Sequence, residues 1–166
     1  MRRIAIIGSC GAGKSTLAVG LGEKLKLPVF HLDAYFWQPG WQETDAQQWL
    51  KIQQQLVKGD RWIIDGNYGS TLDMRLAAAD TIIWLDFNRY LCLSRIFQRY
   101  LKYAGKTRPD MAQACPERLT RDFIKYVWNF PRLYRPQIVA TLAQYQAKQI
   151  ITLHNPRQVL TLLHSV

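Results

Sequence analysis

Gly8-Ser9-Cys10-Gly11-Ala12-Gly13-Lys14-Ser15 fits the pattern G-x-x-x-x-G-K-[ST]. The apolar run Ile-Ala-Ile-Ile at 4–7 precedes it and has the composition of a buried strand. Residues 16–21 follow it and carry apolar side chains that suit a packed helix. The sequence therefore predicts a strand, a glycine-rich turn and a helix, which is the context that this pattern requires. The alternative is a plain glycine turn with Lys14 as a surface charge, and eight residues in register argue against it.

The predicted turn has the chemistry of a phosphate site. Glycines let the backbone curl so that successive N–H groups converge on phosphate oxygens, and the helix that starts there adds its positive dipole end. Lys14 is placed to reach the β- and γ-phosphates of a nucleotide, and the Ser15 hydroxyl to bind Mg²⁺. We expect the nucleotide contacts to come from the turn and the start of the helix: Gly8, Ser9, Cys10, Gly11, Ala12, Gly13, Lys14, Ser15 and Thr16.

The rest of the chain alternates short apolar runs with segments of helical spacing. This alternation predicts a three-layer α/β fold, with a five-stranded parallel sheet buried on both faces, in a single domain over residues 1–166. Strands are expected at 4–7, 29–33, 61–65, 81–86 and 149–153, and helices at 14–25, 44–58, 71–79, 88–103, 116–128, 136–148 and from 156. The helix starts carry capping signals: Thr44 with Gln47 forms a capping box for the second helix, and Asn88 and Asn155 cap the long helix and the last one. Asn129-Phe130-Pro131 is expected to separate the helices at 116–128 and 136–148.

Composition limits the class of protein. With 166 residues and 48% hydrophobic residues, the chain is long enough for one domain with a sizeable core. No apolar run approaches the ~20 residues of a membrane helix, and the short run after Met1 leads straight into the turn, so we expect a soluble cytoplasmic protein without a leader. Three widely spaced cysteines argue against a disulfide framework or a zinc site. Cys10 is either a small filler of the turn or a thiol whose pKa its surroundings lower.

The positive charge is concentrated in one segment. The net charge is +10, and residues 87–148 hold twelve lysines and arginines against three acids, which is +9. Such a segment implies an anionic partner.

Three strand ends carry a carboxylate. Asp65, after Trp62-Ile63-Ile64, has the form of a Walker B residue, so Ser15 and Asp65 are the candidate metal ligands. Asp33 either serves the metal or accepts a proton from a substrate hydroxyl. Asp86 is either functional or part of a helix cap, because Asn88 follows it.

The long predicted helix carries a basic stripe at spacings of four, three and four: Arg95, Arg99, Lys102 and Lys106. These side chains share one face, and no acid occurs between Asp86 and Asp110 to offset their repulsion. The stripe is either a solvated face or a phosphate-binding one. In the second case Arg95 and Arg99 would join Lys14 and Asp33 as catalytic residues, with a lid at about 102–122 that excludes water.

The candidate acceptor site combines an aromatic segment with the loop after the third strand. Rings between 35 and 41 either stack on an acceptor or pack beneath a loop. The candidate substrate residues are Asp33, Tyr35, Trp37, Gly66, Asn67 and Tyr68. No arginine lies between Val29 and Asp60, although an acceptor that already carries a phosphate would need one there. Asn155-Pro156-Arg157 follows the last strand, where an adenine ring would rest, so Arg157 is a further nucleotide candidate.

Six stretches of the sequence resemble those of the bacterial DNA topology modulation proteins, a family similar to the adenylate kinase and shikimate kinase group of P-loop proteins. They are the phosphate loop, Val29-Phe30-His31-Leu32-Asp33, Trp62-Ile63-Ile64-Asp65-Gly66-Asn67-Tyr68, Leu85-Asp86-Phe87, the Arg95/Arg99 pair and Arg108-Pro109-Asp110-Met111. The resemblance covers essentially the whole chain. It implies a strand order 2-3-1-4-5, ATP binding and a small lid after the fourth strand.

By the same resemblance, Asp65-Gly66 is similar to the Asp-Gly of adenylate kinases, where the Asp orders magnesium-bound water. The Arg95/Arg99 pair is similar to their arginines at the lid base, one lying on adenine and the other touching phosphate. Asp33 resembles the acceptor carboxylate of shikimate-type kinases. Asn67-Tyr68-Gly69 stands where adenylate kinases continue Phe-Pro-Arg, which argues against AMP as acceptor.

The sequence thus predicts an ATP- and Mg²⁺-dependent kinase that phosphorylates a hydroxyl-bearing small molecule or a nucleotide, working as a monomer or homodimer. The alternative is a nucleotide-gated DNA-binding protein whose basic segment 87–148 grips phosphate backbones.

Overall fold

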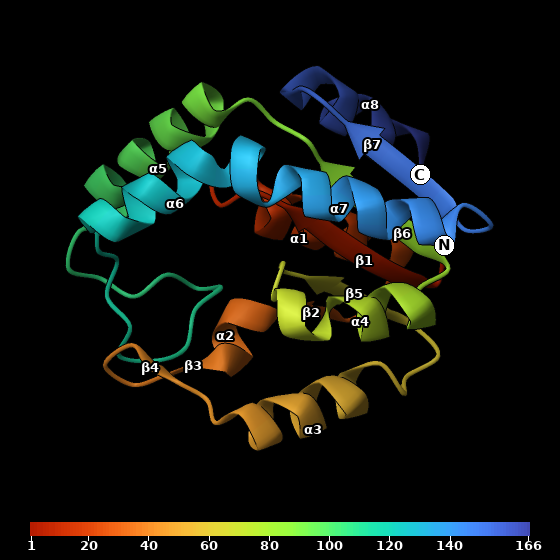
Figure 1. The fold of residues 1–166 in the computed structure, drawn as a ribbon, viewed down its shortest axis with the longest axis horizontal. Helices are drawn as coiled ribbons and strands as arrows, with labels where there is room; N and C mark the ends of the chain where they lie inside the picture. The colour runs from red at the N-terminus through yellow and green to blue at the C-terminus, as the bar shows by residue number, and fades with distance from the viewer.

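The computed structural model describes all residues from 1 to 166, and a parallel sheet forms its centre (Figure 1). Its strands are β1 (Arg3–Gly8), β2 (Val29–His31), β5 (Trp62–Asp65), β6 (Thr81–Leu85) and β7 (Gln149–Leu153). Their order across the sheet is β2-β5-β1-β6-β7, and every pairing is parallel. The expected order 2-3-1-4-5 and the α/β class are therefore confirmed.

The sheet register brings the predicted site residues to one edge. Asp65 lies beside Ile6 of β1 and beside His31 of β2, while Gly8 lies beside Leu85 of β6. The carboxyl ends of parallel strands share an edge, which is where ligands of open α/β sheets bind.

Helices cover both faces of the sheet because its strands are apolar on both sides. One face packs against α1 (Lys14–Leu25), α5 (Arg89–Tyr103) and α8 (Pro156–Ser165), through Leu17, Leu21, Cys92, Ile96 and Leu162. The other packs against α3 (Ala46–Leu56), α4 (Leu72–Ala78) and α7 (Arg135–Leu142), through Trp49, Leu76, Ile138 and Leu142. A 3₁₀ turn, η1 (Gly69–Thr71), precedes α4, and another, η2 (Ala143–Tyr145), follows α7. No helix combines the length and the apolar character needed to cross a membrane.

Helix α6 (Arg121–Leu133) corrects two boundaries expected from the sequence. It begins at Arg121 and not at Pro116, because Thr120 caps it by accepting a hydrogen bond from the Phe123 N–H (3.2 Å). It also runs through Pro131, whose missing N–H removes only one hydrogen bond near the helix end. Val127 joins one core cluster and Phe130 the other, so burial holds the helix intact here.

The chain between α5 and α6, residues 104–120, contains no helix. It folds back on itself through bridges between Ala104 and Glu117 and between Thr107 and Pro116. The part of the predicted lid expected to be helical, from Pro116, is therefore a loop. We call residues 104–120 the α5–α6 loop.

The segment after β2 also differs from expectation. The strand stops at His31, and Asp33 lies in the first turn of the short helix α2 (Leu32–Phe36) instead of at a strand end. A hairpin of β3 (Trp37–Gln38) and β4 (Gln42–Glu43) follows. The cap of α3 is Asp45, which accepts from the Gln47 and Gln48 N–H groups, because the Thr44 hydroxyl donates to the Phe36 carbonyl (2.6 Å) instead.

Candidate active site at the phosphate loop

The turn between β1 and α1 has the backbone of a phosphate loop. Gly8 (φ 146°) and Gly11 (φ 79°) occupy conformations that other residues rarely adopt. A Cβ on Gly8 would lie 2.5 Å from the Leu85 carbonyl oxygen, and one on Gly11 would lie 2.3 Å from that of Cys92. Only glycine fits at these two positions, so β6 and α5 hold the loop in its curled form.

Lys14, the first residue of α1, folds back over this loop. Its ammonium group donates hydrogen bonds to the carbonyl oxygens of Gly8 (3.0 Å) and Ser9 (3.1 Å). The charge therefore lies over the curl of the loop, where phosphate oxygens would meet both the lysine and the N–H groups.

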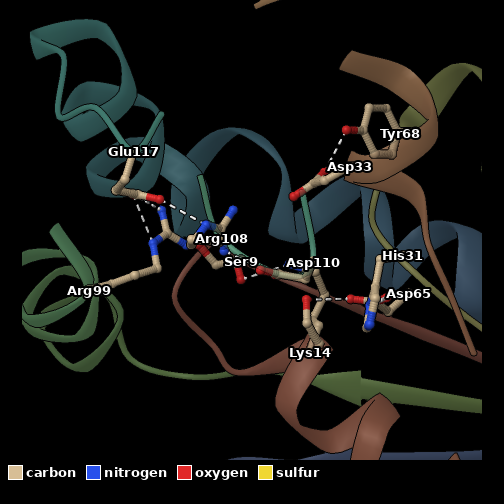
Figure 2. Close-up of polar contacts among 11 residues, drawn as sticks. Ser9, Lys14, His31, Asp33, Asp65, Tyr68, Arg99, Arg108, Asp110 and Glu117 are labelled. Atoms are coloured by element: carbon tan, nitrogen blue, oxygen red, sulfur yellow. Dashed lines mark hydrogen bonds and ion pairs between the residues drawn. The ribbon is translucent and has the colours of Figure 1, made fainter. Parts of the chain in front are cut away.

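Asp65 connects β5 to the loop and to β2. It is 4% exposed, and its carboxylate accepts a hydrogen bond from the Ser15 hydroxyl (2.8 Å). The same carboxylate lies 2.6 Å from Nδ1 of His31, and Figure 2 shows these two side chains together. The hydrogen bond to Asp65 raises the pKa of His31. A hydroxyl and a carboxylate at the mouth of a phosphate loop suit Mg²⁺, which takes one or two protein oxygens and completes its shell with phosphates and water. Ser15 and Asp65 thus fit the metal expected from the sequence.

Asp33 reaches the same edge from α2, although no strand places it there. Its carboxylate accepts a hydrogen bond from the Tyr68 hydroxyl (2.5 Å), as Figure 2 shows. Burial and the neighbouring Asp33 charge raise the pKa of Tyr68, so the phenol stays a donor at neutral pH. The hydrogen bond fixes the direction of the Asp33 carboxylate, as a group that accepts a proton requires.

Arg95 contacts the loop directly. Its guanidinium donates to the Ala12 carbonyl (2.9 Å) and lies 5.6 Å from the centre of the Phe87 ring. Arg99, one turn further along α5, instead pairs with Glu117 of the α5–α6 loop (2.9 Å). Glu117 therefore supplies the acid that the sequence lacks next to the basic stripe. Lys102 and Lys106 are exposed, and only the first two members of the stripe turn inward.

Two residues position the loop after β5, and the sequence did not assign these roles to them. The Asn67 side chain bonds the backbone of Gly8, so it supports the phosphate loop and is not free for an acceptor. The Arg75 guanidinium is 1% exposed and donates to Gln53, Thr71 and the Gly66 and Asn67 carbonyl oxygens, all neutral. Burial lowers its pKa to about 10. An arginine in the middle of a short helix gives no sequence signal of this burial.

No protein-family model and no curated protein sequence matches the chain. Solved structures match it in fold along nearly its whole length. Shikimate kinase from Acinetobacter baumannii in complex with shikimate has a TM-score of 0.65 at 14% identity, covering 99% of this chain and 94% of that one. The chain has the fold of the P-loop kinases. Shikimate kinase from Bacteroides thetaiotaomicron gives a TM-score of 0.56 at 15% identity, with 99% and 95% covered. A gluconokinase from Sinorhizobium meliloti 1021 gives 0.55 at 14% identity, with 99% and 92% covered.

At these identities the likeness shows the P-loop kinase fold and not a substrate. It also does not single out the DNA topology modulation proteins. The polar groups that this chain gathers around its phosphate loop are Lys14, Ser15, Asp33, Asp65 and Arg95, and Arg99 follows Arg95 on α5.

Several residues singled out in the sequence have partners of their own or none. Asp86 is paired with Arg135 through three hydrogen bonds of 2.8–3.1 Å, so its carboxylate is already used. Arg157 is exposed in the first turn of α8 and makes no side-chain hydrogen bond or ion pair. Burial raises the pKa of the Cys10 thiol, although the Lys14 charge acts in the opposite direction. This overturns the idea that the loop activates this cysteine as a thiolate.

The aromatic segment packs partly on itself. Phe36 lies at its centre, with ring centroids 4.7 Å from Tyr68 and 5.0 Å from both Trp37 and Trp49. Trp37 and Tyr35 are half-buried, and Trp37 also meets Trp41 edge-on at 5.3 Å. These rings form a rigid wall beside Asp33, and the partly exposed ones are the part of it that a ligand can touch.

Proposed function

We propose that this protein is a small-molecule kinase that transfers the γ-phosphoryl group of ATP to a hydroxyl group. The observation that carries the proposal is the meeting of two kinds of group at one sheet edge. Lys14, Arg95 and the loop N–H groups suit a triphosphate, while Asp33 is a directed carboxylate on the acceptor side. A nucleotide switch would need the first set and not the second.

The proposed reaction moves one phosphoryl group from one oxygen to another. The acceptor hydroxyl gives its proton to Asp33 as its oxygen bonds to the γ-phosphorus, and the bond between that phosphorus and the β,γ-bridging oxygen breaks, releasing ADP. Charge spreads over the phosphoryl oxygens during transfer, so nearby cations stabilise the transition state. Lys14, Arg95 and Arg99 are the cations proposed for this role. Mg²⁺ held by Ser15 and Asp65 would neutralise the β- and γ-phosphates when bound.

The acceptor side favours a molecule without a phosphate of its own. Residues 29–60 contain no arginine, and the nearby Arg75 is buried with all its contacts made to neutral oxygens. Partly exposed rings at Tyr35 and Trp37 offer flat apolar surface instead. These features support an acceptor with hydroxyls and a planar or sugar-like face.

The DNA-binding alternative rests on the charge of residues 87–148. The likeness to the topology modulation proteins rests instead on sequence motifs. Part of that charge is offset within the protein, since Glu117 pairs with Arg99 and Arg108, and Asp86 pairs with Arg135. No observation on the structure adds to the alternative.

The test is ATP turnover in a screen of nucleosides, sugars, small hydroxy acids and nucleoside monophosphates. We expect one class of hydroxyl acceptor to stimulate ADP release. Lys14→Ala should abolish the stimulation, and the exposed Lys51→Ala in α3 serves as the matched control. Asp33→Asn should remove the stimulation while ATP binding stays near the wild-type value. Stimulation by DNA alone, with a steep salt dependence, would replace the kinase by the alternative.

A further inference from the structure

Glu117 is a buried carboxylate in the α5–α6 loop, and neither the sequence motifs nor the proposed reaction uses it. Its side chain is only 2% exposed. Its backbone is fixed as well, because its N–H donates to the Lys106 carbonyl (2.9 Å) and it forms a bridge with Ala104. A charged group so deeply buried requires compensating partners.

Two arginines from different segments are those partners (Figure 2). Oε1 of Glu117 lies 2.9 Å from both Nε and Nη2 of Arg99 on α5. Oε2 lies 2.8 Å from Nε of Arg108 in the loop. One carboxylate thus holds two guanidinium groups side by side, which would otherwise repel each other.

Each guanidinium keeps one amino group without a protein partner. Arg99 uses Nε and Nη2, which leaves Nη1. In Arg108, Nη1 donates to Asp110 (3.0 Å), Nε lies at ion-pair distance from Glu117 (2.8 Å) but makes no hydrogen bond, and Nη2 has no protein partner. Free N–H groups on fixed guanidinium planes suit phosphate oxygens, which accept paired, charge-assisted hydrogen bonds.

Both arginines are close to the phosphate loop. Gly11 packs against the Cys92 backbone of α5, and Arg95 of the same helix bonds the loop at Ala12. Arg99 follows Arg95 by one turn, on the same face. The charges of Arg99 and Arg108 both lower the pKa of the Cys10 thiol within the loop, against the larger effect of burial.

We propose that Glu117 is a positioning residue that holds Arg99 and Arg108 as a preformed pair for the phosphoryl group in transfer. This rests on the proposed kinase function and adds to it a role for Arg108 and for a carboxylate. Without Glu117 the two guanidinium groups repel each other, Arg99 loses its acidic partner, and Arg108 keeps only Asp110. The entropy of ordering the pair again would then add to the activation free energy of transfer. Glu117 touches no reacting atom and acts only through the arginines.

The test compares Glu117→Gln with wild type in steady-state turnover of ATP with the acceptor found by the screen. We expect kcat to fall by about 10- to 10²-fold, less than the roughly 10²- to 10³-fold for removing an oriented donor outright, because both arginines remain and lose only their fixed direction. KM for ATP should stay within about threefold. Glu23→Gln, an exposed glutamate on α1, is the matched control. Assays run below the thermal midpoint of every variant, so that lost folding does not register as lost kcat.

The decisive measurement is additivity. If Glu117 acts only through the pair, Glu117→Gln should add no further loss to the Arg99→Ala/Arg108→Ala variant. A full additional loss would overturn the proposal, as would an unchanged kcat in Glu117→Gln alone. A lower KM for ATP with unchanged kcat would also overturn it, because Glu117 would then compete with the nucleotide. If wild type bound no ATP in calorimetry, the kinase function itself would fall. Normal wild-type turnover with an unaffected Glu117→Gln would sink only the positioning role.

Discussion

The side chain of Asn67 bonds the backbone of Gly8 in both directions. Its Oδ1 accepts a hydrogen bond from the Gly8 N–H (2.9 Å), and its Nδ2 donates to the Gly8 carbonyl (2.7 Å). The Lys14 ammonium donates to that same carbonyl. The amide therefore ties the loop after β5 to the first residue of the phosphate loop. The candidate acceptor side and the candidate nucleotide side are thus held in place relative to each other.

Replacing Asn67 by alanine should loosen this attachment. We expect ATP affinity to fall by up to about 30-fold, because two hydrogen bonds worth roughly 1 kcal/mol each no longer hold the loop in its binding form. Isothermal titration calorimetry measures the change. Asp45→Ala, which removes two side chain to backbone hydrogen bonds at the cap of α3, is the control and should lower stability without changing ATP affinity. Unchanged affinity in Asn67→Ala would show that the loop keeps its shape unaided.

Asp65→Asn tests which strand-end carboxylate serves the metal. In wild type, adding Mg²⁺ in place of EDTA should tighten ATP binding, and in Asp65→Asn we expect most of that gain to be lost, by about 10-fold or more. Asparagine still accepts the Ser15 hydrogen bond, so the loop should remain intact.

Asp86→Asn is the matched control for Asp65→Asn. It breaks the pairing with Arg135 and should lower stability while leaving the Mg²⁺ effect in place. Equal Mg²⁺ effects in wild type and Asp65→Asn would assign the metal to another group.

Much of the sheet and of the loop could be predicted because local pattern determines them. The register of Gly8–Ser15 and the apolar runs are read directly from neighbouring residues, and they predicted the strands and the position of Lys14. The strand order was implied by the family resemblance. The caps at Asn88 and Asn155 were also correct, since a cap involves residues only two or three apart.

The parts that could not be predicted depend on contacts between distant residues. Glu117 neutralises Arg99 across 18 positions, so a helix that looks unrelieved in sequence is paired in space. The prediction that a helix ends before Pro131 was wrong, because burial of Val127 and Phe130 outweighs the one hydrogen bond that the proline removes. Asp33 sits on α2 because Leu32 turns into the core directly after β2. For Glu117, the sequence offers one feature that sets it apart: it is the only glutamate after residue 43.

Asp80 should give the protein part of its resistance to acid. Partial burial acts to raise its pKa, but hydrogen bonds from the Thr81 hydroxyl (2.7 Å) and the Arg3 and Arg2 N–H groups (both 2.9 Å) outweigh it, and the pKa lies below its ordinary value. A lowered carboxyl pKa stabilises the folded state above the unfolded pKa of about 4, and this stabilisation is lost as the pH falls through the folded pKa.

Asp80→Asn should therefore cost about 1 kcal/mol of unfolding free energy at pH 7, a value reduced for the partial exposure of the site. The difference from wild type should shrink below about pH 4. Urea unfolding followed by tryptophan fluorescence at pH 3 to 7 measures it. Asp60→Asn, which removes an exposed carboxylate that accepts no side-chain or N–H hydrogen bond, is the matched control. A constant difference across the range would mean that the charge of Asp80 contributes nothing.

The hairpin of β3 and β4 lies against the α5–α6 loop (Figure 1). The Trp41 indole N–H donates to the Pro116 carbonyl (3.0 Å), the Gly40 N–H donates to that of Ala114 (3.0 Å), and the Arg118 guanidinium lies 4.5 Å from the centre of the Trp41 ring. Trp41 therefore holds the loop that carries Glu117 and Arg108 against the acceptor side.

Trp41→Ala should release this loop and speed its cleavage by trypsin after Lys106 and Arg118. The lost hydrogen bond and cation–π contact are together worth about 1–2 kcal/mol. Because cleavage follows the population of the open form, the rate should rise roughly 5- to 30-fold. Mass spectrometry of the fragments locates the cuts. The control is Trp128→Ala, which removes a partly exposed tryptophan of α6 that lies under Arg89 of α5. It should leave cleavage of the α5–α6 loop unchanged. Equal cleavage of Trp41→Ala and wild type would mean that the other contacts of the α5–α6 loop, among them the Gly40–Ala114 hydrogen bond and the Glu117 ion pairs, hold it without Trp41.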